Sequence, residues 1–357
     1  MNVAIVAHHH NRAEGTGGYT AELVARVALS HDVTLYAAGV ASAPPANVRV
    51  VRVPALTRFA YGTILTFPIG FAIKRREHDV VHAQGWVTGS ADVVTAHVCV
   101  GAWREALRAS GQPATGGERW FGAWVEQQEG EMIRRARLVI APSEKVKADL
   151  ARCYGRRNDV VVIPHGFPQP RLLEDRHAAR IALGLPRDAF IALYIGDWRK
   201  GLVNAIHAVH AAPKVHLLVV SRRIPLAGRA EGRIHWRETI PGIETAYAAA
   251  DVLLHPTIYD SFGLTVAEAM AYGIPVIVSD AAGVSELVDH GRSGWIVRGD
   301  VVAESAAALE RLGDDHGLRE VLAVTAREVA ARHGWDETVR RTVEVYERAS
   351  RLAPRAS

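Results

Sequence analysis

The chain has 357 residues, of which 49% are hydrophobic and 22% are charged; this balance is typical of a globular protein and excludes a disordered chain. The net charge of +4 is uneven, since residues 1–168 hold 19 lysines and arginines against 14 acidic residues, whereas residues 169–357 hold 23 against 24. No helix-turn-helix, zinc or RNA-binding motif accompanies the basic excess, so nucleic acid is not an expected partner.

The two cysteines and the first residues indicate the compartment. Cys99 and Cys153 provide neither a disulfide framework nor the spacing of metal ligands, which fits a reducing environment. The apolar run Val3–Ala7 near the N-terminus predicts a buried strand and lacks the basic start and cleavage site of a signal peptide. We therefore expect a cytoplasmic protein.

Apolar runs that predict buried strands alternate with helical stretches along the whole chain. The expected strands are residues 3–7, 33–37, 48–53, 79–83, 93–96, 137–141 and 160–163, followed by 190–195, 215–220, 252–255, 275–279 and 294–297. The expected helices include residues 18–29, 143–153, 201–211, 243–250, 264–272 and 301–311. Such alternation predicts an α/β protein built from parallel sheets with helices on both faces.

A proline-rich and polar run, residues 164–170, separates the two series of strands. It predicts two Rossmann-like, doubly wound parallel-sheet domains, residues 1–168 and 169–335. The last helix, within about 336–357, is amphipathic and is expected to pack back on the first domain. Because ligands of open parallel sheets bind beyond the carboxyl ends of the strands, a cleft between the two domains is the expected site.

The basic excess is concentrated in residues 33–76, which contain no acidic residue. The cations of this segment are Arg49, Arg52, Arg58, Lys74, Arg75 and Arg76. They flank an apolar run, residues 59–73, that is too short to span a membrane and is interrupted by Pro68. Two interpretations are open: a helix packed on the sheet, or a peripheral membrane contact in which the cations meet anionic headgroups at the inner membrane face.

Three tryptophans, Trp103, Trp120 and Trp124, flank a glycine-rich stretch between residues 111 and 117. They predict core packing, and the alternative is an aromatic platform for a sugar or lipid acceptor.

Residues 259–277 combine a helix start with two carboxylates. Good helix formers follow Gly263, and Gly273 is expected to end the helix before a buried strand. The unsatisfied amides of Ser261, Phe262, Gly263 and Leu264 would bind a phosphate, as helix N-termini do. The carboxylates, Asp260 before the helix and Glu268 one turn inside it, need hydroxyl partners, as on a ribose or a sugar. This chemistry indicates recognition of a nucleoside diphosphate sugar.

The same stretch resembles the E-x7-E signature of family 4 glycosyltransferases, and the resemblance extends over nearly the whole chain. It implies a GT-B fold and a retaining transferase that moves a hexose from a nucleoside diphosphate sugar to an acceptor hydroxyl. In that family the first acid contacts the donor sugar and the second contacts the ribose, which gives catalytic and donor-binding roles to Asp260 and Glu268. This chain departs from the family in carrying aspartate, one methylene shorter, at position 260.

Two further segments match the family in the first half of the chain. The stretch Gly15–Tyr19 resembles the glycine-rich loop whose backbone approaches the donor phosphate and the acceptor, which assigns donor contacts to Gly17 and Gly18. His97, at the end of the strand 93–96, resembles the histidine near the donor sugar and is the expected catalytic histidine. His82 is the alternative for that role.

Residues 195–201 resemble the family loop whose two cations neutralise the donor diphosphate. Lys200 matches the family lysine and is expected to stabilise the charge that develops as the diphosphate leaves. Asp197 stands where the family usually has an arginine. Arg199 is the expected replacement, and the alternatives are Arg222 and Arg223.

The chain contains no Asp-x-Asp pair with which to clamp a diphosphate through a metal ion, so we expect a metal-independent enzyme without a cofactor. Its expected partners are the nucleotide-sugar donor and a sugar, lipid or small-molecule acceptor. The alternatives are epimerisation or phosphorolysis of a sugar nucleotide on the same fold, or a catalytically idle module that binds a sugar nucleotide or a membrane.

Overall fold

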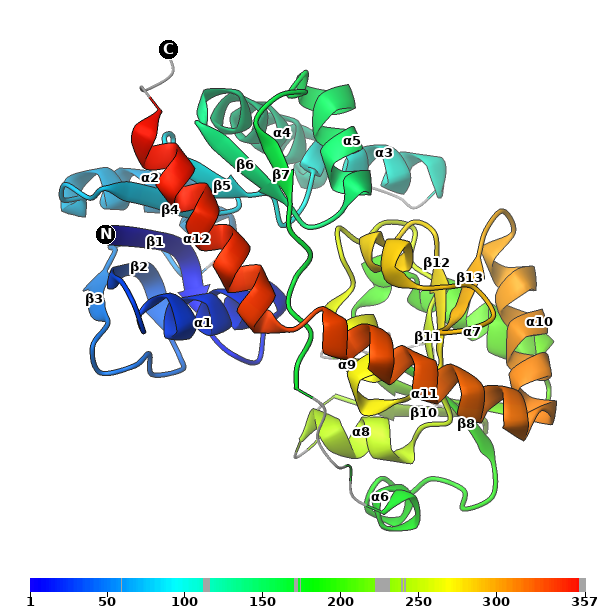
Figure 1. The fold of residues 1–357 in the computed structure, drawn as a ribbon. Coiled ribbons are helices and arrows are strands. Elements are labelled where there is room, and N and C mark those ends of the chain that lie inside the picture. Colours follow the sequence, from blue (N-terminus) through cyan, green and yellow to red (C-terminus); the bar gives the residue numbers. More distant parts are fainter. Residues whose placement is uncertain are drawn as a thin grey trace. The chain divides into compact units, whose positions relative to one another are not determined.

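The computed structural model describes residues 1–58, 60–111, 116–169, 173, 175–221, 232–238, 240 and 242–352, with the backbone alone described at 60, 116–120 and 199. It divides into two compact units (Figure 1). Unit 1 comprises Met1–Gly166 and Trp335–Ser357, and unit 2 comprises Phe167–Gly334. The chain thus leaves unit 1 once and returns to it with its last helix.

Within the described residues, unit 1 is built on a parallel sheet of seven strands in the order β3-β2-β1-β4-β5-β6-β7. The strands are β1 (Asn2–His10), β2 (Asp32–Val40), β3 (Arg49–Arg52), β4 (Val80–Gln84), β5 (Val93–Thr95), β6 (Leu138–Ala141) and β7 (Val160–Val162). Each lies where an apolar run predicted it. Strand β1 also includes His8–His10, of which His9 and His10 pair with Gly39 and Val40 of β2.

The helices of unit 1 cover both faces of this sheet. They are α1 (Gly15–Val27), α2 (Ala60–Lys74), α3 (Val100–Ala109), α4 (Gly116–Arg135), α5 (Glu144–Tyr154) and α12 (Trp335–Arg351). Helices α1 and α12 contact one another and share one core with the sheet. The connections from β1 to β2 and from β3 to β4 run in opposite directions across the sheet. Because such crossovers are right-handed, helix α2 lies on the face opposite to α1.

Helix α2 tests the first interpretation of residues 59–73, that of a helix packed on the sheet. It continues through Pro68 to Lys74 and contacts β1 and β2, with Phe67 and Phe71 fully buried. The expectation of a helix packed on the sheet is therefore confirmed, whereas Pro68 does not interrupt the helix. Phe59 lies outside the described residues.

Unit 2 holds, among its described residues, a parallel sheet of six strands in the order β10-β9-β8-β11-β12-β13. They are β8 (Phe190–Ile195), β9 (Val215–Val220), β10 (Ile234–Arg237), β11 (Val252–His255), β12 (Val276–Ser279) and β13 (Trp295–Val297). The edge strand β10 was not expected from the sequence, because Ile234-His-Trp-Arg237 alternates apolar and polar residues over only four positions.

The helices of unit 2 pack as two layers. They are α6 (Arg176–Ala182), α7 (Leu202–Ala211), α8 (Ile243–Ala249), α9 (Leu264–Tyr272), α10 (Val301–Asp314) and α11 (His316–Arg332). One core contains α7 and α10, another contains α6, α8 and α9, and α11 contributes to both. The predicted α/β class with two doubly wound parallel sheets is confirmed. Among the described residues, no helix combines the length and hydrophobicity that crossing a bilayer requires.

Glu129 on α4 is expected to make the stability of unit 1 depend on pH. Its buried carboxylate accepts hydrogen bonds from the amide of Val100, at 2.7 Å, and from the hydroxyl of Tyr154. Burial raises the pKa of Glu129 to about 7, with the two hydrogen bonds acting against this rise. Because the folded pKa exceeds the unfolded one, the stabilisation is complete below about pH 4 and is lost as the pH rises to about 7, a change of about 3 kcal/mol.

The replacement Glu129→Gln should remove this pH dependence, because the amide cannot ionise in this range. Urea unfolding at pH 5 and pH 8 measures the difference in unfolding free energy directly. The matched change Glu144→Gln, on the exposed start of α5, should leave the wild-type difference intact. An equal pH dependence in wild type and Glu129→Gln would contradict the assignment.

Candidate functional site

The start of helix α9 is fixed by glycine. Gly263 precedes the helix with φ of 107°, in the left-handed region, and a Cβ there would lie 3.0 Å from Val284 Cγ1. Gly273 ends the helix with φ of 72°. The helix thus spans the predicted residues 264–272, and the carbonyl of Gly263 accepts the amides of Val266 and Ala267, at 3.0 and 3.3 Å.

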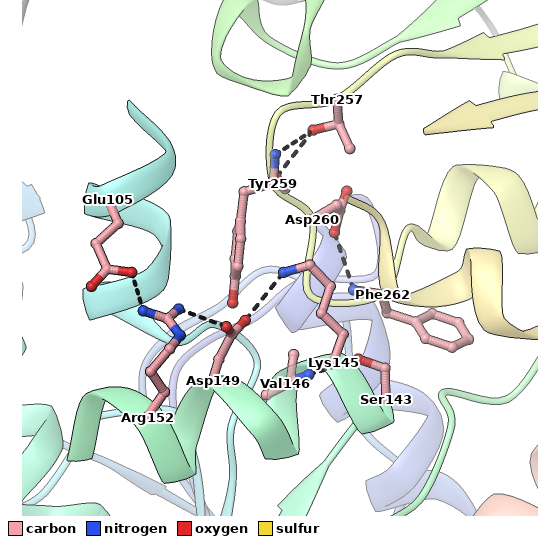
Figure 2. Close-up of polar contacts among 10 residues, drawn as sticks. All are labelled: Glu105, Ser143, Lys145, Val146, Asp149, Arg152, Thr257, Tyr259, Asp260 and Phe262. Atoms are coloured by element: carbon pink, nitrogen blue, oxygen red, sulfur yellow. Dashed lines mark hydrogen bonds and ion pairs between the residues drawn. The ribbon is translucent and has the colours of Figure 1, made fainter. Parts of the chain in front are cut away.

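Asp260 lies directly before this helix and is almost buried, with 8% of its side chain exposed. Its Oδ2 lies 3.0 Å from Lys200 Nζ and 3.2 Å from His255 Nε2. Its Oδ1 accepts a hydrogen bond of 3.3 Å from the amide of Phe262 (Figure 2). The carboxylate therefore holds both the lysine and the loop that leads into α9.

The contacts of Phe262 correct one expectation. The amide of Phe262 was expected to be unsatisfied and to face a ligand, but it donates to Asp260. Its side chain is buried and packs against Phe167, with ring centroids 6.1 Å apart. The physical reason is that the short aspartate side chain folds back on the amide two residues later. Phe262 thus anchors the loop in the core of unit 2.

The charges of Lys200 and Asp260 stabilise one another. Burial alone would raise the pKa of Asp260, but the positive charge of Lys200 and the proximity of His255 outweigh it and hold that pKa well below its usual range. The charge of Asp260 in turn raises the pKa of Lys200. Both groups are therefore ionised at neutral pH, and the side chain of Lys200 remains 45% exposed and able to meet an anion.

The position of Lys200 depends on tight packing between two loops. Lys200 ends the 3-10 turn η1 (Trp198–Lys200), and Gly201 follows with φ of 90°. A Cβ on Gly201 would lie 2.1 Å from the carbonyl oxygen of Pro256, so only glycine fits. Asn204 Nδ2 also donates to that carbonyl, at 3.1 Å. These contacts bring the loop after β8 against the loop after β11, which leads to Asp260.

The arginine expected beside Lys200 is not placed by the structure. The side chain of Arg199 and the whole of Arg222 and Arg223 lie outside the described residues. Asp197, which stands at the family's arginine position, accepts through its carbonyl a hydrogen bond of 2.6 Å from the hydroxyl of Tyr194.

Glu268 lies one turn into α9 and has a specific partner. The hydroxyl of Tyr247, on α8, donates to Glu268 Oε2 at 2.6 Å. Burial raises the pKa of Glu268, and the hydrogen bond from Tyr247 acts against that rise. Glu268 is thus a partly buried carboxylate fixed by a hydrogen bond from Tyr247, and it is not a solvated residue on the helix surface.

Three residues around these carboxylates were not expected from the sequence. His255 ends β11 and lies next to Asp260. Its position at the end of a strand could have identified it as a site residue, as it did for His97. Tyr247 carries no local signal, because it reaches Glu268 from 21 residues away. Val284, on the turn η3 (Gly283–Leu287), supports the loop by donating its amide to the carbonyl of Phe262 at 2.7 Å.

In unit 1 the glycines at the start of α1 have a packing role. Gly17 and Gly18 lie in the first turn of α1, not in a loop before it. A Cβ on Gly17 would lie 2.6 Å from the carbonyl oxygen of Asn11, and one on Gly18 would lie 3.1 Å from that of Arg12. Glycine is therefore needed here for the helix to start so close to the end of β1.

His97 and His82 belong to one polar network. His97 Nε2 lies 2.9 Å from Gln84 Oε1, and its ring packs on Tyr19 with centroids 4.8 Å apart. Burial lowers the pKa of both His97 and His82 to about 3, so both rings are neutral at pH 7. His97 could therefore offer a neutral hydrogen-bonding ring to a substrate.

His82 does not fit the alternative role that the sequence offered. It lies inside β4 rather than at the end of the strand, and it is fully buried. Its ring nitrogens lie 2.7 Å from the hydroxyl of Tyr346 and 2.8 Å from that of Thr95. His82 thus links helix α12 to the sheet. Separately, in the part of the chain that the structure describes, no three His, Cys, Asp or Glu side chains gather as a metal site.

Comparisons with known proteins agree with this geometry. Residues 13–169 match the model of Glycosyltransferase Family 4, and residues 189–315 match that of Glycosyl transferases group 1. A D-inositol 3-phosphate glycosyltransferase of Xylanimonas cellulosilytica is 30% identical over 315 residues, which cover 78% of this chain and 73% of that protein.

Solved structures share the fold over nearly the full length. The sucrose-phosphate synthase of Thermosynechococcus elongatus superposes with a TM-score of 0.80 at 22% identity, covering 97% of this chain and 98% of its own. Anabaena HepE in complex with UDP-glucose gives 0.69 at 18% identity, covering 99% and 100%. The chain therefore belongs to glycosyltransferase family 4 and is a glycosyltransferase of the GT-B fold.

Proposed function

We propose that this enzyme transfers a hexose from a nucleoside diphosphate sugar to an acceptor hydroxyl, with retention of the anomeric configuration and without a metal ion. The observation that carries the proposal is the position of Lys200, held 3.0 Å from Asp260 at the start of α9, with Glu268 one turn further on. A solved relative of the same fold binds UDP-glucose, which supports a nucleotide-sugar donor.

Each group of this site has a proposed role. Lys200 and two amides at the N-terminus of α9, those of Gly263 just before the helix and of Leu264 at its first position, would bind the diphosphate, because a cation and a helix N-terminus both favour phosphate. Glu268 would accept hydrogen bonds from the ribose hydroxyls. Asp260 would orient the sugar, and its contact with Lys200 adds the further task of holding the lysine in place.

The proposed reaction takes place on one face of the sugar. The bond between the anomeric carbon and the diphosphate oxygen breaks, and the acceptor oxygen forms its new bond to that carbon from the same face. The acceptor proton passes to an oxygen of the departing diphosphate. Lys200 stabilises the negative charge that grows on the diphosphate, which is the task that a metal ion performs in enzymes with paired aspartates.

His97, Gly17 and Gly18 of unit 1 are proposed to serve the same reaction. The neutral ring of His97 would hydrogen-bond the donor sugar, and the tight start of α1 would let the backbone approach the donor and acceptor. We further propose that the enzyme acts in the cytoplasm, since Cys99 and Cys153 form no disulfide, as is usual for proteins of a reducing compartment.

A transfer assay tests the proposal. The enzyme is incubated with UDP-, GDP-, ADP- and dTDP-hexoses and a panel of acceptors in the presence of EDTA, and the product is examined by proton NMR. We expect a glycoside with the anomeric configuration of the donor and no loss of rate in EDTA. Inversion, or an epimerised donor or sugar phosphate in place of a glycoside, would contradict the proposed reaction. A rate abolished by EDTA and restored by a divalent cation would contradict metal independence.

A further inference from the structure

Helix α2 carries a stripe of exposed apolar side chains. Tyr61, Leu65, Ile69 and Ile73 are 47%, 46%, 63% and 73% exposed. Residues four apart lie on the same side of a helix, so these four side chains form one line, about 18 Å long at 1.5 Å per residue. We call these four residues the α2 stripe. The one charged residue of α2 is Lys74, at its last position.

The opposite side of α2 is fixed, so the helix cannot turn to bury the stripe. Phe67 and Phe71 are fully buried in unit 1. A Cβ on Gly62 would lie 2.6 Å from the carbonyl oxygen of Leu56, and one on Gly70 would lie 2.2 Å from that of Pro54. These glycines let the helix backbone press directly on the preceding chain. The stripe is therefore held outward by packing.

Aromatic side chains extend the stripe onto α4. The ring of Tyr61 meets Phe121 edge-on with centroids 4.4 Å apart, and Phe121 lies 5.4 Å from Trp124. Trp124, itself partly exposed, packs on Trp86 at 5.2 Å. Tyrosine and tryptophan are favoured where apolar surface meets water, above all at the headgroup level of a bilayer. The side chain of Trp120 lies outside the described residues.

Both ends of α2 are basic. Arg58 precedes the helix, and Lys74, Arg75 and Arg76 close it, all four exposed. No acidic residue occurs from 33 to 76, and the first one after the stripe is Glu77. An apolar line with one cation before it and three after it is complementary to a surface of acyl chains beneath anionic headgroups.

We infer that the α2 stripe, with Trp124 and the flanking cations, is the surface by which unit 1 docks on an anionic lipid bilayer. Helix α2 has 15 residues, fewer than the roughly 20 needed to cross a membrane, and its inner side is fixed to the sheet. It would therefore lie along the membrane surface. A second copy of the chain is a poorer occupant, since pairing two such faces brings cations against cations. This inference concerns unit 1 and does not depend on the donor site.

Vesicle flotation of the 357-residue chain tests the inference. Vesicles of phosphatidylcholine with about 30 mol% phosphatidylglycerol are compared with phosphatidylcholine alone, at ionic strengths of about 0.1 M and 1 M. We expect binding to the anionic vesicles at low salt, and weaker binding both at high salt and to the neutral vesicles.

Two sets of variants separate the apolar and the electrostatic contributions. Leu65→Gln with Ile69→Gln should weaken the partition coefficient at least tenfold, and Lys74→Gln with Arg75→Gln and Arg76→Gln should weaken it about 100-fold at low salt. The matched controls lie on unit 2. They are Val321→Gln with Val324→Gln on the exposed side of α11, and Arg187→Gln with Lys214→Gln and Arg292→Gln. Both controls should bind as wild type.

The outcomes are distinct. Circular dichroism and the donor-induced shift in melting temperature show that each variant is folded and still binds its donor, so loss of docking is separable from failure of the donor site. No flotation of the wild type on anionic vesicles would overturn the inference. So would equal losses in the stripe variants and their controls, or a wild-type dimer that the stripe variants convert to monomer without any vesicle binding.

Discussion

Replacing Lys200 by alanine is expected to lower kcat by about 10²–10³-fold, the usual effect of removing one group that stabilises charge in a transition state. Lys200 is held toward the start of α9 by Asp260 at 3.0 Å, and the charge of that carboxylate raises its pKa. It is therefore a fixed, protonated cation where the diphosphate would leave. Steady-state kinetics with saturating donor and acceptor measures the change.

The control for this variant is Lys214→Ala, which removes an exposed lysine from the same unit and should leave kcat unchanged. Lys200→Arg keeps the positive charge and should recover part of the lost rate, although the larger guanidinium has a different geometry. A kcat for Lys200→Ala within twofold of wild type would show that Lys200 takes no part in stabilising the leaving group.

Replacing Asp251 by alanine is expected to destabilise unit 2 by about 3–5 kcal/mol, because it leaves a buried charge without its partner. Asp251 Oδ2 lies 2.7 Å from Arg180 Nη2 and also accepts the amide of Ile191 at 2.7 Å. Both side chains of the pair are buried. Arg176 adds a contact of 2.8 Å to Oδ1. Thus one carboxylate joins helix α6 to the sheet.

Calorimetry of the unfolding transition of unit 2 tests this expectation. The control is Asp289→Ala, which breaks an exposed pair with Arg292 at 3.5 Å and should change stability by less than about 0.5 kcal/mol. If Asp251→Ala were no more destabilising than this control, the ion pair with Arg180 would not hold α6 to the sheet.

Strands and helices with strong apolar patterns could be predicted from the sequence. Runs such as Val3–Ala7 and Val252–His255 are buried on both faces of a parallel sheet. Because both faces are buried, such strands appear in the sequence as continuous hydrophobic segments. Helix α9 was predicted to its last residue, because glycine in the left-handed conformation precedes and ends it. Strand β10 could not be predicted, because its four residues carry too short an apolar pattern. It is an edge strand that forms through its hydrogen-bonded pairing with β9.

Spacing within the sequence predicted the part of the site whose residues are close together, whereas Lys200 was predicted from the family resemblance. Asp260, Gly263 and Glu268 share one loop and helix, so their spacing was informative. The pairing of Asp260 with Lys200 joins two loops 60 residues apart. It depends on the contact between Gly201 and Pro256, which no local pattern reveals. No local pattern reveals either that the hydroxyl of Tyr247 donates to Glu268 or that His82 is buried in contact with Tyr346.

We propose that unit 2 binds a nucleotide sugar through Lys200, Glu268 and the start of α9. The most direct measurement is the thermal shift of wild type, Glu268→Ala and the exposed control Glu310→Ala with UDP-, GDP-, ADP- and dTDP-sugars. At a donor concentration of 100 times Kd, we expect one donor to stabilise wild type and Glu310→Ala by about 2.7 kcal/mol, and Glu268→Ala far less. Equal stabilisation of all three proteins, or stabilisation by no donor, would contradict the claim.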